Sequence, residues 1–245
     1  MSTSQTNQED ALRTAIRQHW GYEGFLPLQR ESMQCVLDHQ DSVVVLPTGG
    51  GKSLCFQVPA LCQDGLAVVV SPLISLMVDQ VQALNACGVA AACINSTMSY
   101  ADRRQVAQAV EDRELKLLYV APERLVMPKT LEFLSQSEIA FFAIDEAHCI
   151  SSWGHDFRPE YRGLRILKER FPELGVHAYT ATATETVRQD IADQLALQDP
   201  TFHVGTFDRP NLNYKVMRRK DGLNQIRGVI DRHPNESGIV YCISR

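Results

Sequence analysis

The sequence lacks the features that would place this chain in a membrane or outside the cell. No run approaches the ~18 continuous apolar residues of a membrane-spanning helix, and the first ten residues are too polar for a secretory signal. The seven cysteines form no Cys-x-x-Cys pair, so reduced core thiols are favoured over disulfides or a metal cage. We therefore expect a soluble protein of the bacterial cytoplasm or the eukaryotic nucleus, without zinc or a membrane partner.

An excess of positive charge is absent as well. The 24 Lys and Arg residues face 29 Asp and Glu residues, which gives a formal net charge of -5. This balance argues against a broad basic surface that wraps nucleic acid, so any such contact must be confined to a loop or a cleft. What the chain does have is 44% hydrophobic residues over 245 positions, enough for the core of one large domain.

Short, continuous apolar runs alternate with helical patterns along the chain. The predicted strands cover residues 42–46, 66–71, 90–94, 115–120, 139–144 and 176–180, and the predicted helices cover residues 54–61, 74–86, 101–110 and 185–195. Because strands buried on both faces are apolar throughout, we predict an α/β fold with a mostly parallel sheet and helices on both faces. Ligands of such sheets bind at the carboxyl ends of the strands.

The C-terminal segment differs in composition from the rest. Pro210 and its polar neighbours predict a linker, followed by strands at 213–217 and 238–242 and a helix at 223–231. Three elements cannot bury a core of their own. We therefore assign residues 1–206 to a first domain and residues 207–245 to a linker and the truncated start of a second. The residues after 211 should be loosely packed.

A glycine-rich segment, Leu-Pro-Thr-Gly-Gly-Gly-Lys-Ser, occupies residues 46–53 between a predicted strand and a predicted helix. It matches the P-loop spacing Gly-x-x-x-x-Gly-Lys-Ser/Thr, except that Leu46 replaces the first glycine. Consecutive glycines let backbone N–H groups surround a phosphate, and the following helix directs its positive end at the same anion. A plain glycine turn is the alternative, which the strand and helix on either side argue against. The predicted ATP-binding residues are Thr48, Gly49, Gly50, Gly51, Lys52 and Ser53.

Two carboxylates follow the predicted strand at 139–144. Beside a P-loop, an aspartate at a strand end can hold Mg²⁺ together with the P-loop hydroxyl, and a neighbouring glutamate can deprotonate the attacking water. We assign Asp145 and Ser53 to the metal, Glu146 to the general base and Lys52 to the β- and γ-phosphates. Taken alone, an Asp-Glu pair is also an ordinary helix start. His148 is expected to relay the nucleotide state to a neighbouring element, with a purely structural role as the alternative.

These motifs together resemble those of a known enzyme family. The Asp-Glu-Ala-His segment at 145–148 resembles the DEAH box of superfamily-two helicases, and further segments resemble RecQ-type DNA helicases. Those segments are residues 70–76, 79–80, 119–125, 180–184, 207–212 and 238–245. The resemblance implies a RecA-like P-loop NTPase domain with the start of a second one. It also implies ATP-dependent, 3′-to-5′ unwinding of DNA in recombination and repair.

Residues 149–161 resemble the aromatic-rich loop of RecQ helicases, which implies that they couple DNA binding to ATP hydrolysis. Trp153 and Phe157 offer flat faces for bases, and such stacking is worth roughly 1–3 kcal/mol per base. Arg158 can pair with phosphate or stack, and His155 lies between the aromatic residues. The alternative is a hydrophobic anchor with Trp153 in the core. Three hydroxyl residues at strand ends are also expected to serve DNA binding or coupling: Ser71, Thr180 and Thr182.

Residues 21–29 resemble the family motif that recognises adenine. The Gln29 amide offers a donor and an acceptor for the adenine edge, and the Tyr22 ring can stack on the base. Leu26 stands where the family carries an arginine, which leaves adenine selectivity open. Val78, where relatives often carry a lysine, is expected to weaken one contact to the DNA backbone.

The family resemblance also indicates what lies outside this chain. An arginine of the second motor domain stabilises the transferred phosphate and is worth about 10³–10⁵ in rate. We therefore expect this chain to bind ATP, Mg²⁺ and single-stranded or partly duplex DNA, and to hydrolyse ATP poorly without the missing second motor domain. Two alternatives stay open: another superfamily-two translocase, and a truncated, non-catalytic module that binds DNA or nucleotide.

Overall fold

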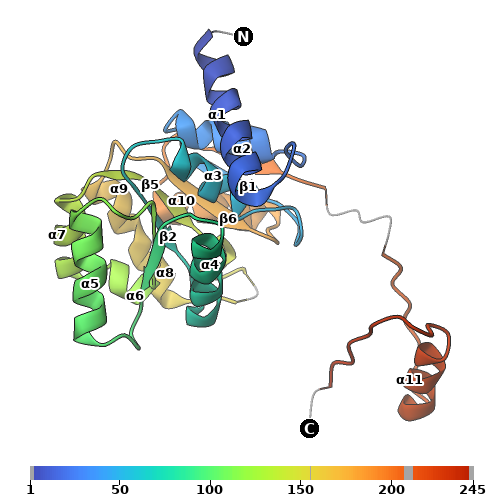
Figure 1. Cartoon of the computed structure of the whole chain (residues 1–245). Coiled ribbons are helices and arrows are strands. Elements are labelled where there is room, and N and C mark those ends of the chain that lie inside the picture. The colour runs from blue at the N-terminus through green and yellow to red at the C-terminus, as the bar shows by residue number, and fades with distance from the viewer. Residues whose placement is uncertain (1–2, 155, 207–211, 243–245) are drawn as a thin grey trace. The chain divides into compact units, whose positions relative to one another are not determined.

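A sheet of seven strands organises the larger of the two units into which the chain divides, Met1–Phe207 (Figure 1). The computed structural model describes residues 3–154, 156–206 and 212–242. The strands are β1 (Ser42–Val45), β2 (Leu66–Val70), β3 (Ala91–Ile94), β4 (Leu117–Val120), β5 (Ile139–Ile144), β6 (Val176–Thr180) and β7 (Thr201–Val204). Their order is β3-β4-β2-β5-β6-β1-β7, and every neighbouring pair is parallel. The predicted α/β fold is confirmed.

The sheet buries both of its faces, and the apolar runs of the sequence reflect this. Successive residues of a strand point to opposite faces, so Val43 and Val45 pack into one core cluster while Val44 packs into another. All of β1, β2 and β4 is buried. Strand β7 was not predicted. It pairs with β1 at the edge of the sheet, and its sequence alternates polar and apolar residues, of which the apolar Phe202 and Val204 are 40% and 39% exposed.

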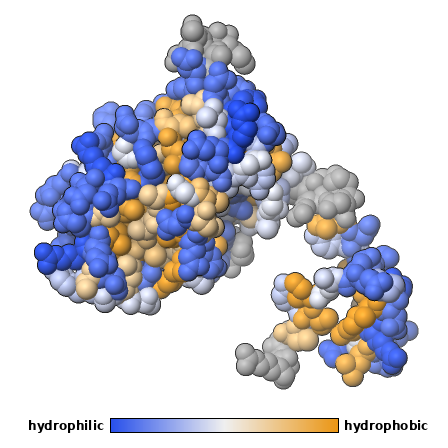
Figure 2. Space-filling view, in the orientation of Figure 1, coloured by the Kyte–Doolittle hydropathy of each residue, from blue (hydrophilic) through white to orange (hydrophobic). Residues whose placement is uncertain are grey.

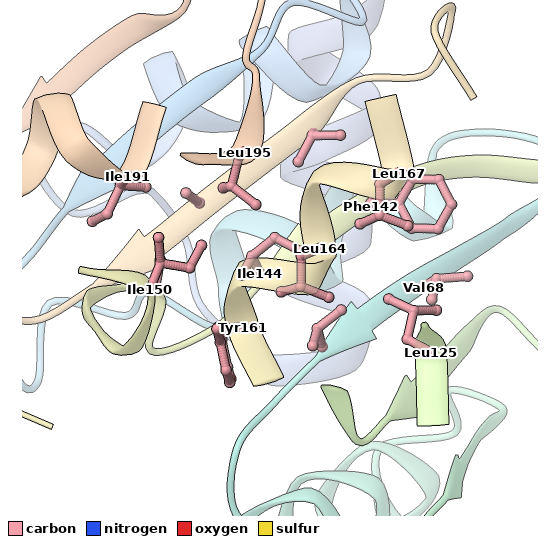
Figure 3. Packing of buried hydrophobic residues seen from close by; sticks show 14 of the residues in the cluster. Val68, Leu125, Phe142, Ile144, Ile150, Tyr161, Leu164, Leu167, Ile191 and Leu195 are labelled. Atoms are coloured by element: carbon pink, nitrogen blue, oxygen red, sulfur yellow. The ribbon is translucent and has the colours of Figure 1, made fainter. Parts of the chain in front are cut away.

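One face of the sheet is covered by the helices that follow the strands from β3 onward (Figure 3). Figure 3 shows Tyr161, Leu164, Leu167, Ile191 and Leu195 of these covering segments packed with Phe142 and Ile144 of β5. The segments are α5 (Tyr100–Glu111), α6 (Pro122–Leu125), α7 (Pro128–Ser135), η1 (Ala147–Ile150), α8 (Pro159–Arg162), η2 (Gly163–Arg165), α9 (Ile166–Arg170) and α10 (Glu185–Leu195).

The other face is covered by α2 (Gln29–Leu37), α3 (Leu54–Leu61) and α4 (Ile74–Ala86). Helix α1 (Thr3–Trp20) packs outside α2 and α3 through Leu12 and Ile16. Helices α3, α4 and α10 have the predicted bounds, whereas α1, α2 and α6 to α9 were not predicted. No described helix is both long enough and apolar enough to span a bilayer.

The smaller unit, Asp208–Arg245, holds one helix among its described residues, α11 (Gly222–Ile230). The strands predicted at 213–217 and 238–242 are wrong, since neither range forms a strand. No described residue of this unit is buried, and Leu223 and Tyr241 are 83% and 90% exposed. Figure 2 shows apolar side chains on its surface. A strand requires neighbours for its backbone groups, and within the described residues no strand pairs with either range. The predicted linker at 207–211 lies outside the described residues.

Candidate nucleotide and DNA site

Three of the predicted site segments lie at the carboxyl ends of three neighbouring strands. Strand β6 lies between β5 and β1, and β2 lies on the other side of β5. The phosphate loop follows β1, the Asp-Glu-Ala-His segment follows β5, and the residues from Thr180 to Thr182 follow β6. In a parallel sheet these ends share one edge, so the topology brings the three segments together.

The phosphate loop owes its shape to its glycines. Gly49 and Gly51 have φ angles of 84° and 70°, in the left-handed region that side chains disfavour. A Cβ at Gly50 would lie 2.9 Å from the carbonyl oxygen of Pro47, which already accepts a hydrogen bond from the Gly50 N–H. Leu46 is 2% exposed and packs in the core on the α3 side of the sheet. The departure from the usual motif therefore serves packing and leaves the glycine turn intact.

Asp145 is a buried carboxylate, only 3% exposed, at the end of β5. Burial, helped by the nearby charge of Glu146, raises the pKa of Asp145 to about 6, against the lowering effects of the Glu146 N–H, Lys52 and Gln80. The Glu146 N–H donates to its Oδ1 atom at 2.9 Å. A carboxylate in this setting is stabilised by a cation, and oxygen ligands are those that Mg²⁺ prefers. The Asp145 carboxylate therefore has the donor chemistry of a Mg²⁺ ligand.

Glu146 has an unusual backbone conformation, with φ 48° and ψ 43°. The left-handed region costs a non-glycine residue roughly 1–2 kcal/mol, and such strain collects at functional sites. Its side chain is 28% exposed, whereas that of His148 in η1 is 8% exposed. Glu146 is thus open to water, as a general base must be, while Asp145 directly before it is enclosed.

His148 joins the loop after β5 to the end of β6. Its Nδ1 atom lies 2.9 Å from Oγ1 of Thr180 and 3.3 Å from a carboxylate oxygen of Glu146. The Thr180 hydroxyl donates in turn to the Thr182 carbonyl oxygen at 3.3 Å. These contacts therefore join four of the five residues from these two segments that the sequence singled out for catalysis or coupling: Glu146, His148, Thr180 and Thr182.

The aromatic loop presents its rings to solvent. Trp153 is 75% exposed and Phe157 is 37% exposed, so the alternative that Trp153 anchors the core is wrong. The guanidinium of Arg162 lies 4.9 Å from the centre of the Phe157 ring. The loop is held at its base by the Ser151 hydroxyl, which donates to Asp190 at 2.6 Å. His155 lies outside the described residues.

Arg158 ties this loop to the segment between β2 and α4. Its Nη1 atom donates to the Pro72 carbonyl oxygen at 3.0 Å, and its Nη2 atom pairs with Asp156 at 3.0 Å. Sequence reasoning missed the Pro72 contact, for which no motif gives a signal. Ser71 was predicted to serve DNA binding or coupling, but it is fully buried. Its hydroxyl therefore does not reach a DNA strand in this conformation.

A group of possible metal ligands lies at the base of the same loop. Ligand atoms of His148, Cys149 and Asp156 lie within 4.8 Å of one another. Burial raises the pKa of the Cys149 thiol to about 12, which disfavours the thiolate that a metal requires. Asp156 already pairs with Arg158. This group therefore offers no prepared zinc site.

Gln29 connects the predicted adenine motif to the phosphate loop. It is 1% exposed, its Oε1 atom accepts a hydrogen bond from the Leu26 N–H at 2.7 Å, and its Nε2 atom donates to the Gly51 carbonyl oxygen at 3.1 Å. Both ends of the amide are thus engaged within the protein. Tyr22 and Leu26 are 55% and 49% exposed, and so both are open to a base.

Comparison with known proteins identifies the family. The sequence pattern of the DEAD/DEAH box helicase family matches residues 26–190. The chain belongs to the DEAD/DEAH box helicase family. This chain is also 46% identical over 226 residues to the ATP-dependent DNA helicase RecQ of Pasteurella multocida, a match that covers 92% of this chain and 36% of the relative. It is 44% identical over 232 residues to RecQ of Haemophilus influenzae, covering 95% of this chain and 38% of that one.

The resemblance to RecQ helicases is thereby confirmed, and the chain spans less than half the length of these relatives. Among solved structures, the DUF1998 helicase MrfA bound to DNA matches with a TM-score of 0.63 at 19% identity, covering 80% of this chain and 29% of that one. The helicase domain of Pyrococcus furiosus Hef matches with a TM-score of 0.57 at 17% identity, covering 79% of this chain and 39% of that one. These matches confirm the RecA-like fold of the DEAD/DEAH box helicase domain.

Proposed function

We propose that this chain is the first motor domain of an ATP-dependent DNA helicase of the RecQ type. One observation carries the proposal. A buried carboxylate beside a P-loop, Asp145, shares the edge of the sheet with an exposed aromatic loop that carries Trp153. A nucleotide site alone suits any P-loop protein, whereas exposed rings tied to it suit a motor that moves along single-stranded nucleic acid.

Each residue of the nucleotide site has a distinct task in this proposal. The backbone N–H groups of the phosphate loop and the Lys52 ammonium bind the phosphates of ATP. Ser53 and Asp145 hold Mg²⁺, which neutralises charge that develops on the phosphate oxygens. Glu146 orients the attacking water and accepts its proton. His148, held beside Thr180 at 2.9 Å, passes the state of the site to β6.

The aromatic loop is the proposed DNA contact. Trp153 and Phe157 stack on bases, Arg158 contacts the backbone, and His155 lies within the same loop. The RecQ relatives are named as DNA helicases, which favours single-stranded and partly duplex DNA over RNA. By the same resemblance we propose 3′-to-5′ movement, a role in recombination and repair, and action in the bacterial cytoplasm or the eukaryotic nucleus.

We further propose that residues 207–245 are a linker and the start of a second motor domain, which supplies the arginine for phosphate transfer. In that case the chain alone binds ATP but turns it over slowly. A non-catalytic module is the competing proposal, and both predict little hydrolysis by the isolated chain. They differ once the second domain is present, because only a motor then hydrolyses ATP in a DNA-dependent manner.

The decisive experiment measures ATP hydrolysis with and without single-stranded DNA. The proteins compared are this chain, a form extended by the second motor domain, and the same two with Glu146→Gln. We expect near-background turnover by the chain and DNA-stimulated turnover by the extended form, which Glu146→Gln abolishes. Robust, Glu146-dependent turnover by the chain alone would disprove the need for an external arginine. If the extended form hydrolyses no ATP even with DNA, the non-catalytic module is favoured.

A further inference from the structure

A chain of hydrogen-bonded polar side chains runs from helix α3 to the carboxylate of Asp145; Gln57 and Tyr119 in it are buried, and Gln80 is half-buried. Gln57 of α3 donates from Nε2 to the Tyr119 hydroxyl at 3.0 Å. The Tyr119 hydroxyl donates to Oε1 of Gln80 at 2.8 Å, and Nε2 of Gln80 faces Oδ2 of Asp145 at 3.4 Å. The network thus joins α3, which follows the phosphate loop, to strand β4, helix α4 and the end of β5.

This polar chain lies where the rest of the packing is apolar. Tyr119 is fully buried within the core cluster between the sheet and helices α3 and α4, and Gln57 is 6% exposed. Polar groups cost free energy when they are buried unless they are hydrogen-bonded, and apolar side chains of similar size could fill the same space. A fully connected network of this kind orients its members, because each donor needs a specific acceptor.

The direction of the hydrogen bonds determines which end of the Gln80 amide faces Asp145. Tyr119 and Gln57 both direct donors at Oε1 of Gln80, at 2.8 Å and 3.4 Å. The amide therefore presents its N–H₂ group to the carboxylate, whereas the opposite orientation would place two acceptors face to face. The second oxygen of Asp145, Oδ1, is held by the Glu146 N–H at 2.9 Å. Each carboxylate oxygen thus has one protein donor and remaining lone pairs.

We propose that Gln80 is a positioning residue for the metal site: it holds the Asp145 carboxylate in the orientation that receives Mg²⁺, with Tyr119 and Gln57 fixing the amide. The proposal rests on the nucleotide site described above. In this proposal Gln80 and its two supporting residues act through Asp145 and not through a contact of their own with the nucleotide. Their effect is confined to the Mg²⁺-dependent part of nucleotide binding, because Lys52 and the backbone of the phosphate loop bind the phosphates without them.

The test measures the affinity of the whole chain for a fluorescent ATP analogue, methylanthraniloyl-ATP, at increasing Mg²⁺ and in EDTA. The variants are Gln80→Leu, Tyr119→Phe, and Gln82→Leu as the matched control, since Gln82 is exposed on the same helix. We expect the Mg²⁺ concentration that gives half of the increase in affinity for the analogue to be about tenfold higher for Gln80→Leu, which corresponds to about 1.4 kcal/mol. Tyr119→Phe should shift the midpoint in the same direction by a smaller factor, and Gln82→Leu should not shift it.

Binding in EDTA separates a positioning role from a structural one. We expect the affinities of all variants in EDTA to stay within about twofold of the original chain. An unchanged Mg²⁺ midpoint in Gln80→Leu, or an equal loss with and without Mg²⁺, would overturn the proposal. If Gln80→Leu does not fold, as judged by circular dichroism, Tyr119→Phe decides the matter because it keeps the buried ring. A failure of the original chain to bind the analogue under either condition would instead refute the proposed nucleotide site.

Discussion

The imidazole Nδ1 atom of His148 lies 2.9 Å from the hydroxyl oxygen of Thr180, and both residues are buried. The contact links the loop after β5, which carries the two acidic residues, to the end of the neighbouring strand β6. The two residues are separated by 32 positions in the sequence, so the contact depends on the parallel pairing of β5 with β6.

Thr180→Val should lower the free energy of unfolding by about 1 kcal/mol. The substitution keeps the branched shape of the side chain but removes one buried hydrogen bond. A hydrogen bond of this kind typically contributes about 1 kcal/mol to the free energy of unfolding. Thr180→Ser, which keeps the hydroxyl, should preserve that bond and lose only the contacts of one methyl group. Urea denaturation followed by circular dichroism measures both variants. Indistinguishable urea midpoints for Thr180→Val and the original chain would show that the contact adds no stability.

The buried carboxylate of Asp145 should make the metal-free chain less stable as pH rises. Its pKa is raised from 3.8 to about 6, chiefly by burial, so between these pH values the folded state holds a proton that the unfolded state releases. The unfolding free energy therefore falls as pH rises from about 4 to about 6, and the loss is complete above that window. Asp145→Asn should remove this fall and stabilise the chain at pH 7 by about 1–3 kcal/mol, since one pKa unit corresponds to about 1.4 kcal/mol.

Urea denaturation in EDTA at pH values from 4 to 8 tests this prediction. The informative quantity is the difference between the original chain and Asp145→Asn, because other titrating groups cancel in it. A difference that does not change with pH would contradict the raised pKa. Mg²⁺ with ATP should reduce the difference, because a bound cation favours the charged carboxylate.

Trp153→Ala should weaken DNA binding without destabilising the fold. The ring is 75% exposed, and removal of such a side chain usually changes stability by less than about 0.5 kcal/mol. Loss of one stacked base costs roughly 1–3 kcal/mol, or about fivefold to 150-fold in affinity. Fluorescence anisotropy with a labelled single-stranded oligonucleotide measures the change. Tyr100→Ala is the control, since Tyr100 is 76% exposed at the start of α5.

Coupling by the aromatic loop needs a separate measurement. In a form extended by the second motor domain, Trp153→Ala should reduce the stimulation of ATP hydrolysis by DNA and leave the DNA-free rate unchanged. Normal stimulation at saturating DNA would limit Trp153 to binding alone.

Gln29→Ala should weaken binding of ATP more than binding of GTP. The amide is the group expected to distinguish the adenine edge, although in this structure its Nε2 atom donates to Gly51 and its Oε1 atom accepts from Leu26. Competition of ATP and GTP against a fluorescent analogue measures both affinities, with Gln34→Ala on the same helix as the control. An equal loss for both nucleotides would remove Gln29 from adenine recognition and leave it as a support of the phosphate loop.

Some features of this protein follow from local sequence alone. The three valines of β1 are buried because both faces of the sheet are covered. A strand of this kind shows in the sequence as a short, continuous apolar run. The glycines at 49 and 51 are required by the positive φ angles of a phosphate-binding turn. Asp145 follows a buried strand, and the order of strands and helices predicts that it lies at the same edge as that turn.

Other features were decided by tertiary packing, and sequence reasoning missed them. The strands predicted at 213–217 and 238–242 do not form, because a β-strand is stabilised by neighbours that local sequence does not supply. Strand β7 forms from a weakly apolar segment because β1 offers it an edge. Ser71 is fully buried, and the Nε2 atom of Gln29 donates a hydrogen bond to the Gly51 carbonyl oxygen.

The contacts of Gln80 also depend partly on local sequence and partly on tertiary packing. Its sequence position places it on α4, but only the packing of α4 against β4 and β5 sets its amide between Tyr119 and Asp145. Hydrogen bonds between residues 39 and 65 positions apart depend on which elements become neighbours in the sheet. Sequence thus determined six strands and four helices of the larger unit and the chemistry at the strand ends, because these depend on short-range periodicity and residue type. The tertiary structure determined which side chains meet, because that depends on the order of the strands and the burial it produces.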